Sequence, residues 1–190
     1  MFFLIIAAPF LIILVSLLIG RYPVDMATVL NILGCRLTMQ PCYIEDIYQT
    51  VVWDIRLPRA ILGAMVGGCL AISGAAFQGL FRNPLVSSGI LGVSSGAGFG
   101  AALAIILFHK VAAIYTFAFA FGILAVILSY LISKVYNGTP TIMLVLGGVI
   151  VSSVFSALLS LAKYLADPMN ELPAIVFWLM GSLASARYSD

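Results

Sequence analysis

Two short segments place a hydrogen-bonding side chain directly before a proline, between long apolar runs. These pairs are Asn83-Pro84 and Thr139-Pro140. Asparagine and threonine oxygens accept hydrogen bonds from the first amides of a helix, and proline suits the first helical position. The pattern therefore predicts a proline-initiated helix start at both places. Ordinary helix capping and the shaping of a pore mouth are both compatible with these residues.

Acidic side chains are absent from the long apolar runs. Within a membrane, acidic groups usually mark proton relays or ion sites. The single histidine, His109, stands at the end of an apolar run beside Lys110, which favours an interfacial position. No G-x-x-x-x-G-K-[ST] loop for nucleotides occurs either. We therefore expect no catalytic residue, metal site or cofactor in this chain. The seven acidic residues are Asp25, Glu45, Asp46, Asp54, Asp167, Glu171 and Asp190.

Two cysteines, Cys35 and Cys42, lie in the first polar segment. They could form a disulfide if that segment faces an oxidising compartment, but their spacing alone does not decide this. Paired and free thiols both remain open.

The composition indicates the elements that carry these residues. The chain is 63% hydrophobic and 8% charged, whereas soluble domains carry about 25% charged residues. A membrane span needs about 20 apolar residues, and the small net charge of +2 suggests no nucleic-acid surface. We predict an all-α, polytopic transmembrane helical bundle. The predicted spans are Phe2–Ile19, Ala60–Leu80, Gly89–Phe108, Val111–Ile132 and Ile142–Ala162, with Ala174–Leu183 as a shorter interfacial or re-entrant helix.

The remaining segments refine this bundle. Phe2–Ile19 lacks the basic start and the cleavage pattern of a signal peptide, so we interpret it as an uncleaved span. Between Arg21 and Arg59, the sequences DMATVLNIL and IEDIYQTVVWDI predict two short amphipathic pieces at the membrane surface. The pairs Gly63/Gly67 and Gly96/Gly100 have the small-xxx-small spacing that lets helix backbones approach closely.

The segment Ile55–Ala104 resembles the FecCD-type permeases of ABC importers. It shares R-L-P-R, a glycine- and alanine-rich helix, S-G-x-x-x-Q, N-P-L and L-G-x-S-x-G-A with that family. The later sequences LVLGGVIVSSVFSALLSL and VFWLMGSL look like its fifth helix and the short helix that follows. The resemblance implies the type II ABC importer permease fold, with about ten spans in the family and about five here. It implies one permease domain over residues 1–190, which stops before the ATPase-coupling segment, as a fragment or an interrupted gene.

The resemblance also implies roles for individual residues. Arg56 and Arg59 match arginines that meet acidic side chains of a substrate-binding protein outside the cell. Snorkelling at a helix end is the alternative for both. A cytoplasmic gate, at the mouth of a pathway between two permease copies, is implied for Asn83, Pro84, Leu85, Thr139, Pro140 and Thr141. Serines of the fifth helix would add mild polarity to that pathway.

The assembly implied by the resemblance is a homodimer in a bacterial or archaeal cell (inner) membrane. Two ATP-binding subunits would hold the ATP and Mg²⁺, and one periplasmic or lipoprotein substrate-binding protein would deliver the cargo. The implied cargo is an iron chelate, haem, cobalamin or a related metal compound, with molybdate in the wider family. A passive channel and a non-transporting accessory membrane subunit are the alternatives.

The distribution of positive charge disagrees with this orientation. Family topology places the Arg21–Arg59 segment outside and the N-P-L turn inside. The positive-inside rule favours the reverse, but the counts are small and Arg56 and Arg59 have a separate implied role, so we follow the family. The outer segments would hold Arg21, Arg36, Arg56, Arg59, Lys110 and Lys163, and the inner ones only Arg82 and Lys134.

Overall fold

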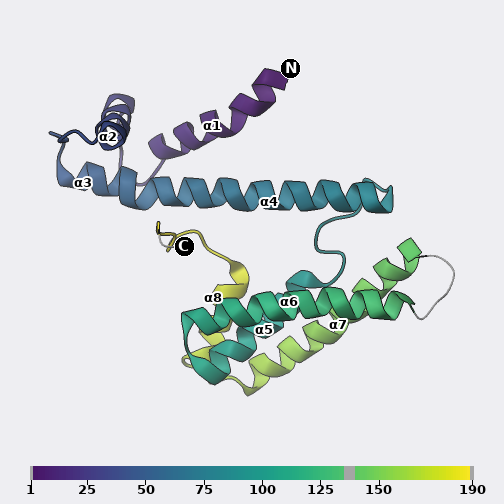
Figure 1. Cartoon of the computed structure of the whole chain (residues 1–190). Helices are drawn as coiled ribbons and strands as arrows, with labels where there is room; N and C mark the ends of the chain where they lie inside the picture. The colour runs from purple at the N-terminus through teal and green to yellow at the C-terminus, as the bar shows by residue number, and fades with distance from the viewer. Residues whose placement is uncertain (1, 135–139, 189–190) are drawn as a thin grey trace. The chain divides into compact units, whose positions relative to one another are not determined.

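The computed structural model describes residues 2–134 and 140–188, and every regular element in this part of the chain is a helix (Figure 1). The chain forms two compact units. The first unit consists of the residues up to Ala71 together with those from Leu183 onward, and the second unit is Ile72–Ser182. One permease domain over residues 1–190 stays a prediction. The helices are α1 (Phe2–Leu18), α2 (Met26–Thr38), α3 (Asp46–Gln49), η1 (Thr50–Arg56), α4 (Leu57–Phe81), α5 (Val93–Phe108), α6 (Val111–Lys134), α7 (Pro140–Leu165) and α8 (Glu171–Met180).

Helices occupy all five predicted spans, which confirms the predicted all-α membrane fold. Three of them are long and apolar enough to cross a bilayer: the helix that ends in α4, and the helices α6 and α7. The helix α5 is shorter, with 16 residues. The predicted short helix near the C-terminal end is α8, shifted by three residues toward the N-terminus.

The segment IEDIYQTVVWDI is not a separate surface piece, so that prediction is wrong. From Asp46 to Phe81 the chain is one continuous helix of 36 residues. Pro58 has no amide hydrogen, and its ring crowds the carbonyl four residues back. The turns before it are π-helical, and the Leu57 N–H reaches the Val52 carbonyl, five residues back. This wider turn makes room for the proline without a break in the helix.

The other predicted surface piece is confirmed as a helix, α2. Asp25 caps its start by accepting hydrogen bonds from the Thr28 N–H, at 3.1 Å, and from the Thr28 hydroxyl. These bonds lower the pKa of Asp25. The helix ends at Met39, in the left-handed conformation, and the Gln40 N–H then bonds to the Cys35 carbonyl at 3.0 Å.

Cys35 and Cys42 are both free thiols in the structure. A hydrogen bond with Cys35 raises the pKa of the Cys42 thiol. The two side chains therefore meet at the end of α2 without a covalent bond.

The second unit is built around close contacts among α5, α6 and α7, which lie side by side in Figure 1. A Cβ on Gly96 or Gly100 would overlap the carbonyl oxygen of Phe121 or Phe117, respectively. The backbones of α5 and α6 are thus in direct contact, as the small-xxx-small spacing predicts. Phe155 of α7 is buried against these helices.

Candidate functional site: the N-P-L turn

The helix α4 ends in a Schellman motif, immediately before the N-P-L sequence. Arg82 has φ 48°, and its N–H bonds to the Gly79 carbonyl at 3.3 Å. The Asn83 N–H bonds to the Gln78 carbonyl at 3.2 Å. These two bonds satisfy carbonyls that the end of a helix leaves without partners. The motif ends α4 sharply and turns the chain into the segment that carries Asn83, Pro84 and Leu85, which we call the N-P-L turn.

Asn83 is a turn residue and not the cap of a helix. Its side-chain oxygen accepts the Leu85 N–H at 2.9 Å, and its carbonyl accepts the Val86 N–H at 3.4 Å. This is an Asx turn, in which the asparagine side chain mimics the backbone. The predicted helix start at Asn83-Pro84 is therefore wrong.

The helix α5 begins later than predicted, at Val93 and not at Gly89. Gly92 precedes it with φ 81°, a left-handed conformation that glycine adopts without steric cost. The residues from Gly89 to Gly92 form a turn, with a 3.0 Å hydrogen bond from the Gly92 N–H to the Gly89 carbonyl. The apolar run continues through this turn, so hydropathy alone does not reveal the boundary.

A cavity of about 250 Å³ lies between the N-P-L turn and the first turns of α7. Asn83, Leu85 and Thr141 all line this turn cavity, so the structure brings together three of the six predicted gate residues. The Leu85 side chain is 89% exposed. The remaining lining is apolar and consists of Phe81, Val86, Ile90, Ile142 and Val145.

The other three predicted gate residues are placed less completely. Pro84 lies within the N-P-L turn, between Asn83 and Leu85. Pro140 is the first residue of α7, as its sequence position predicts. Thr139 lies outside the described residues. A gate role for all six stays a prediction.

Arg56 and Arg59, predicted to dock a binding protein, both have backbone partners within the first unit. Arg56 donates to the carbonyls of Leu17, Leu18 and Tyr22. The first two belong to the last turn of α1, where carbonyls lack helical partners and carry partial negative charge. Arg59 donates to the Ala184 carbonyl. Docking stays a prediction for both, and the structure adds a role for Arg56 in holding the end of α1.

A second cavity, of about 370 Å³, lies beside these arginines. Arg21, Arg56 and Arg59 line it together with apolar and small side chains. None of the described acidic residues of the first unit is among its lining residues, so this surface is cationic. Such a surface suits an acidic partner.

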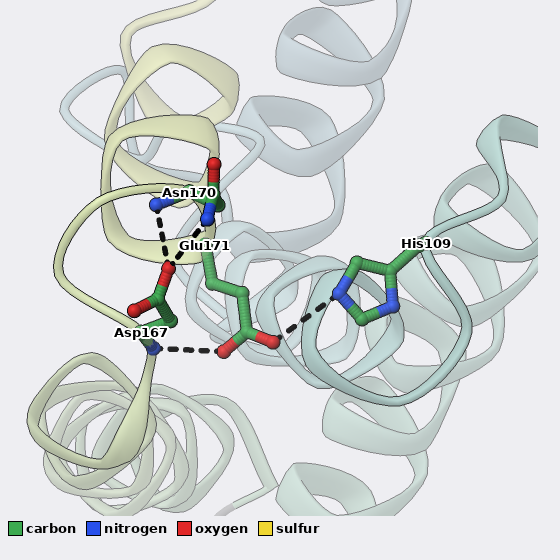
Figure 2. Close-up of polar contacts among 4 residues, drawn as sticks. All are labelled: His109, Asp167, Asn170 and Glu171. Carbon is green, nitrogen blue, oxygen red and sulfur yellow. Dashed lines mark hydrogen bonds and ion pairs between the residues drawn. The ribbon is translucent and has the colours of Figure 1, made fainter.

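A polar corner at the start of α8 was not found by sequence reasoning. His109 Nε2 lies 3.2 Å from Glu171 Oε1, and the other carboxylate oxygen accepts the Asp167 N–H at 2.9 Å (Figure 2). Asp167 in turn accepts from the backbone and side-chain nitrogens of Asn170, at 2.8 and 2.9 Å. These reciprocal bonds resemble a capping box. The contact between His109 and Glu171, which are 62 residues apart in the sequence, holds the first turn of α8 near the α5–α6 connection.

Among residues 2–134 and 140–188, no group of three or more histidine, cysteine or acidic side chains could hold a metal ion.

The chain matches the FecCD transport family over residues 6–190. It is 41% identical over 174 residues to the molybdate import system permease protein of Haemophilus influenzae, covering 92% of this chain and 51% of that protein. It is also 41% identical over 148 residues to the cobalamin import system permease protein of Halobacterium salinarum, covering 77% of this chain and 40% of that protein. The chain thus spans about half the length, or less, of these curated relatives.

The chain is also similar to a solved structure. It is described as a metal-chelate type ABC transporter in an inward-facing conformation. The TM-score is 0.81 at 37% sequence identity, and the match covers 98% of this chain and 55% of that one.

Proposed function

Because the chain belongs to the FecCD transport family, we propose that it serves in the permease subunit of an ABC importer. In this role it is a multi-pass membrane protein that forms part of a pathway for cargo. ATP hydrolysis takes place on separate ATP-binding subunits, and the chain itself is not an enzyme.

The observation that carries this proposal is the turn cavity. Asn83 and Leu85, from the N-P-L turn, and Thr141, from α7, line one small cavity. In our proposal this region is the cytoplasmic gate, with Leu85 as its apolar plug and the two polar side chains facing hydrated cargo. A leucine that is 89% exposed suits a plug that contacts a second permease copy.

The proposed partners are a second permease copy, two ATP-binding subunits and one substrate-binding protein outside the cytoplasm. The cationic surface of Arg21, Arg56 and Arg59 supports docking of an acidic protein surface, because opposite charges steer association and fix its register. The proposed location is the inner membrane of a bacterium or archaeon.

The proposed cargo is a metal compound. The relatives named above import molybdate and cobalamin, and a further relative in Helicobacter pylori, 41% identical over 140 residues, is named for iron chelatin transport. We propose molybdate, an iron chelate, haem or cobalamin, with the choice made by the substrate-binding protein.

The test of this proposal is affinity purification of the tagged protein from native membranes, followed by mass spectrometry. We expect an ATP-binding subunit to copurify. A preparation that contains the chain but lacks any ATP-binding subunit would contradict an ATP-driven importer and would favour a channel or an accessory subunit.

Replacement of Leu85 by alanine tests the gate directly. We expect passive leakage of cargo from vesicles that contain the purified complex to rise about tenfold, because the apolar plug is removed. Leu107→Ala, at an exposed leucine near the far end of α5, is the matched control and should leave leakage unchanged. Equal leakage in the two variants would count against a gate at Leu85.

A further inference from the structure

Ser129 differs from six other hydroxyl groups in the described helices in the direction of its hydrogen bond. Its side chain is fully buried and donates to the Leu91 carbonyl at 2.9 Å, outside its own helix, α6. Hydroxyls within helices commonly bond to a carbonyl of the preceding turn. Those that do so here are Ser16, Thr38, Thr116, Ser133, Ser153 and Ser160.

The Leu91 carbonyl needs this donor because of its place in the chain. It lies in the turn before α5, whose first intrahelical bond runs from the Gly96 N–H to the Gly92 carbonyl. Leu91 itself is 4% exposed, so water is a poor substitute as a partner. A buried carbonyl without a hydrogen bond costs free energy comparable to that of the lost bond.

The backbone of α7 also contacts the Gly89–Gly92 turn. A Cβ on Gly148 would overlap the Ile90 carbonyl oxygen, and a Cβ on Gly147 would lie 2.8 Å from the Ser129 carbonyl oxygen. The absence of side chains at both positions lets α7 touch the turn and α6 at once. Ile90, whose carbonyl fills this space, also lines the turn cavity.

We propose that Ser129 is a positioning residue that, with Gly148, locks the Gly89–Gly92 turn to α6 and α7. The N-P-L turn is held with it, because the next residue, Val86, is buried in one cluster with Leu91. The turn and the start of α7 then form one rigid body, and the turn cavity keeps its shape when the importer changes state. Tightly packed contacts of this kind do not deform continuously. Movement of the gate occurs between this body and its surroundings, and not between Leu85 and Thr141. The role of this body in a gate rests on the proposed function, whereas its rigidity does not.

The distance between spin labels at positions 85 and 141 tests this lock. Leu85 and Thr141 are both exposed, so each can be replaced by a labelled cysteine once the native cysteines are changed to serine. Pulsed electron resonance on the protein in lipid, with any copurified subunits, gives the distribution of this distance. Labelled chains are mixed with an excess of unlabelled chains, so that most assemblies contain one labelled copy. We expect one narrow distribution, which Ser129→Ala broadens about twofold because the Leu91 carbonyl loses its donor.

Ser133→Ala is the matched control, since Ser133 lies four residues along α6 and bonds within its own helix, to the Tyr130 carbonyl. It should leave the distribution narrow. If Ser129→Ala does not fold, Ser129→Cys keeps the size of the side chain with a weaker donor, and it should broaden the distribution to a smaller extent. The side chain at position 129 is fully buried, and mass spectrometry checks that only positions 85 and 141 carry the label. Distributions for the Ser129 variants as narrow as that of Ser133→Ala would overturn the lock.

Addition of ATP and Mg²⁺ to the assembled complex provides the second arm. We expect the distance between positions 85 and 141 to stay the same when the nucleotide is added. A shift in its mean would overturn the rigid body. The comparison without nucleotide needs no transport activity, so failure of the lock and failure of the proposed function are distinguishable.

Discussion

The helices α4 and α5 contain the same small-xxx-small spacing, yet they use it differently. In α5, Gly96 and Gly100 lie directly against carbonyl groups of α6. In α4, a Cβ on Gly67 would meet no described atom of its own unit within 4 Å, and one on Gly63 would make only an ordinary contact with Leu183. Glycine spacing therefore permits close approach of helices but does not by itself bring a partner helix.

A further glycine, Gly20, is intermediate between these two cases. A Cβ there would lie 2.5 Å from Nη2 of Arg56, so its neighbour is the end of a flexible side chain and not a backbone. Gly100, Gly20 and Gly67 form a series. An added Cβ would meet a backbone at Gly100, a flexible side chain at Gly20 and no described neighbour of its own unit at Gly67. The series makes the comparison testable with one kind of substitution.

Gly100→Ala should have the largest effect. The added methyl group overlaps the Phe117 carbonyl, so α5 and α6 must separate along their contact. We expect a loss of about 3 kcal/mol in the free energy of unfolding, at the upper end for overpacking. Unfolding in mixed detergent, followed by circular dichroism, measures this loss. An unchanged midpoint would mean that α5 and α6 do not touch at this position.

Gly20→Ala should have an intermediate effect. The methyl group displaces the Arg56 guanidinium, which then loses bonds to carbonyls at the end of α1. We expect a loss of about 1 kcal/mol, because the side chain can move and water can reach these carbonyls. The double variant with Arg56→Gln, measured in the same way, should show no further loss from Gly20→Ala. Full additivity would show that the alanine acts elsewhere.

Gly67→Ala should have the smallest effect. Within this chain the added methyl group meets no described neighbour in its unit, and alanine favours a helix over glycine. We expect the free energy of unfolding to rise by about 0.5 kcal/mol, at the lower end for an unstrained replacement of glycine by alanine. A loss as large as that for Gly100→Ala would show that α4 packs against another helix, and it would remove the contrast between the two helices.

The helices and part of the site could be predicted from the sequence, because both depend on local patterns. Apolar length placed α6 and α7, and the N-P-L motif pointed to Asn83 and Leu85, which lie with Thr141 at one cavity. The error at Asn83-Pro84 arose because an Asx turn and a helix cap use the same residues. The π-helical turns before Pro58 carry no sequence signal of their own.

The missed contacts join positions that are distant in sequence. Ser129 and Leu91 are 38 residues apart, and the acceptor is a backbone carbonyl, which any residue provides. A serine within an apolar run is equally compatible with a bond to its own helix. The Arg56 contacts with the end of α1 were missed for the same reason. Only the three-dimensional arrangement of helices identifies such partners.

The two-residue connection His109-Lys110 between α5 and α6 has a consequence for biosynthesis. With 16 residues, α5 is shorter than the stretch of about 20 that spans a bilayer alone. Its contacts with α6 are close in sequence, and such local contacts form early. We expect α5 to enter the membrane together with α6, as a hairpin, after α6 has left the ribosome. The order of insertion would then follow from the contacts that the glycines of α5 make with α6.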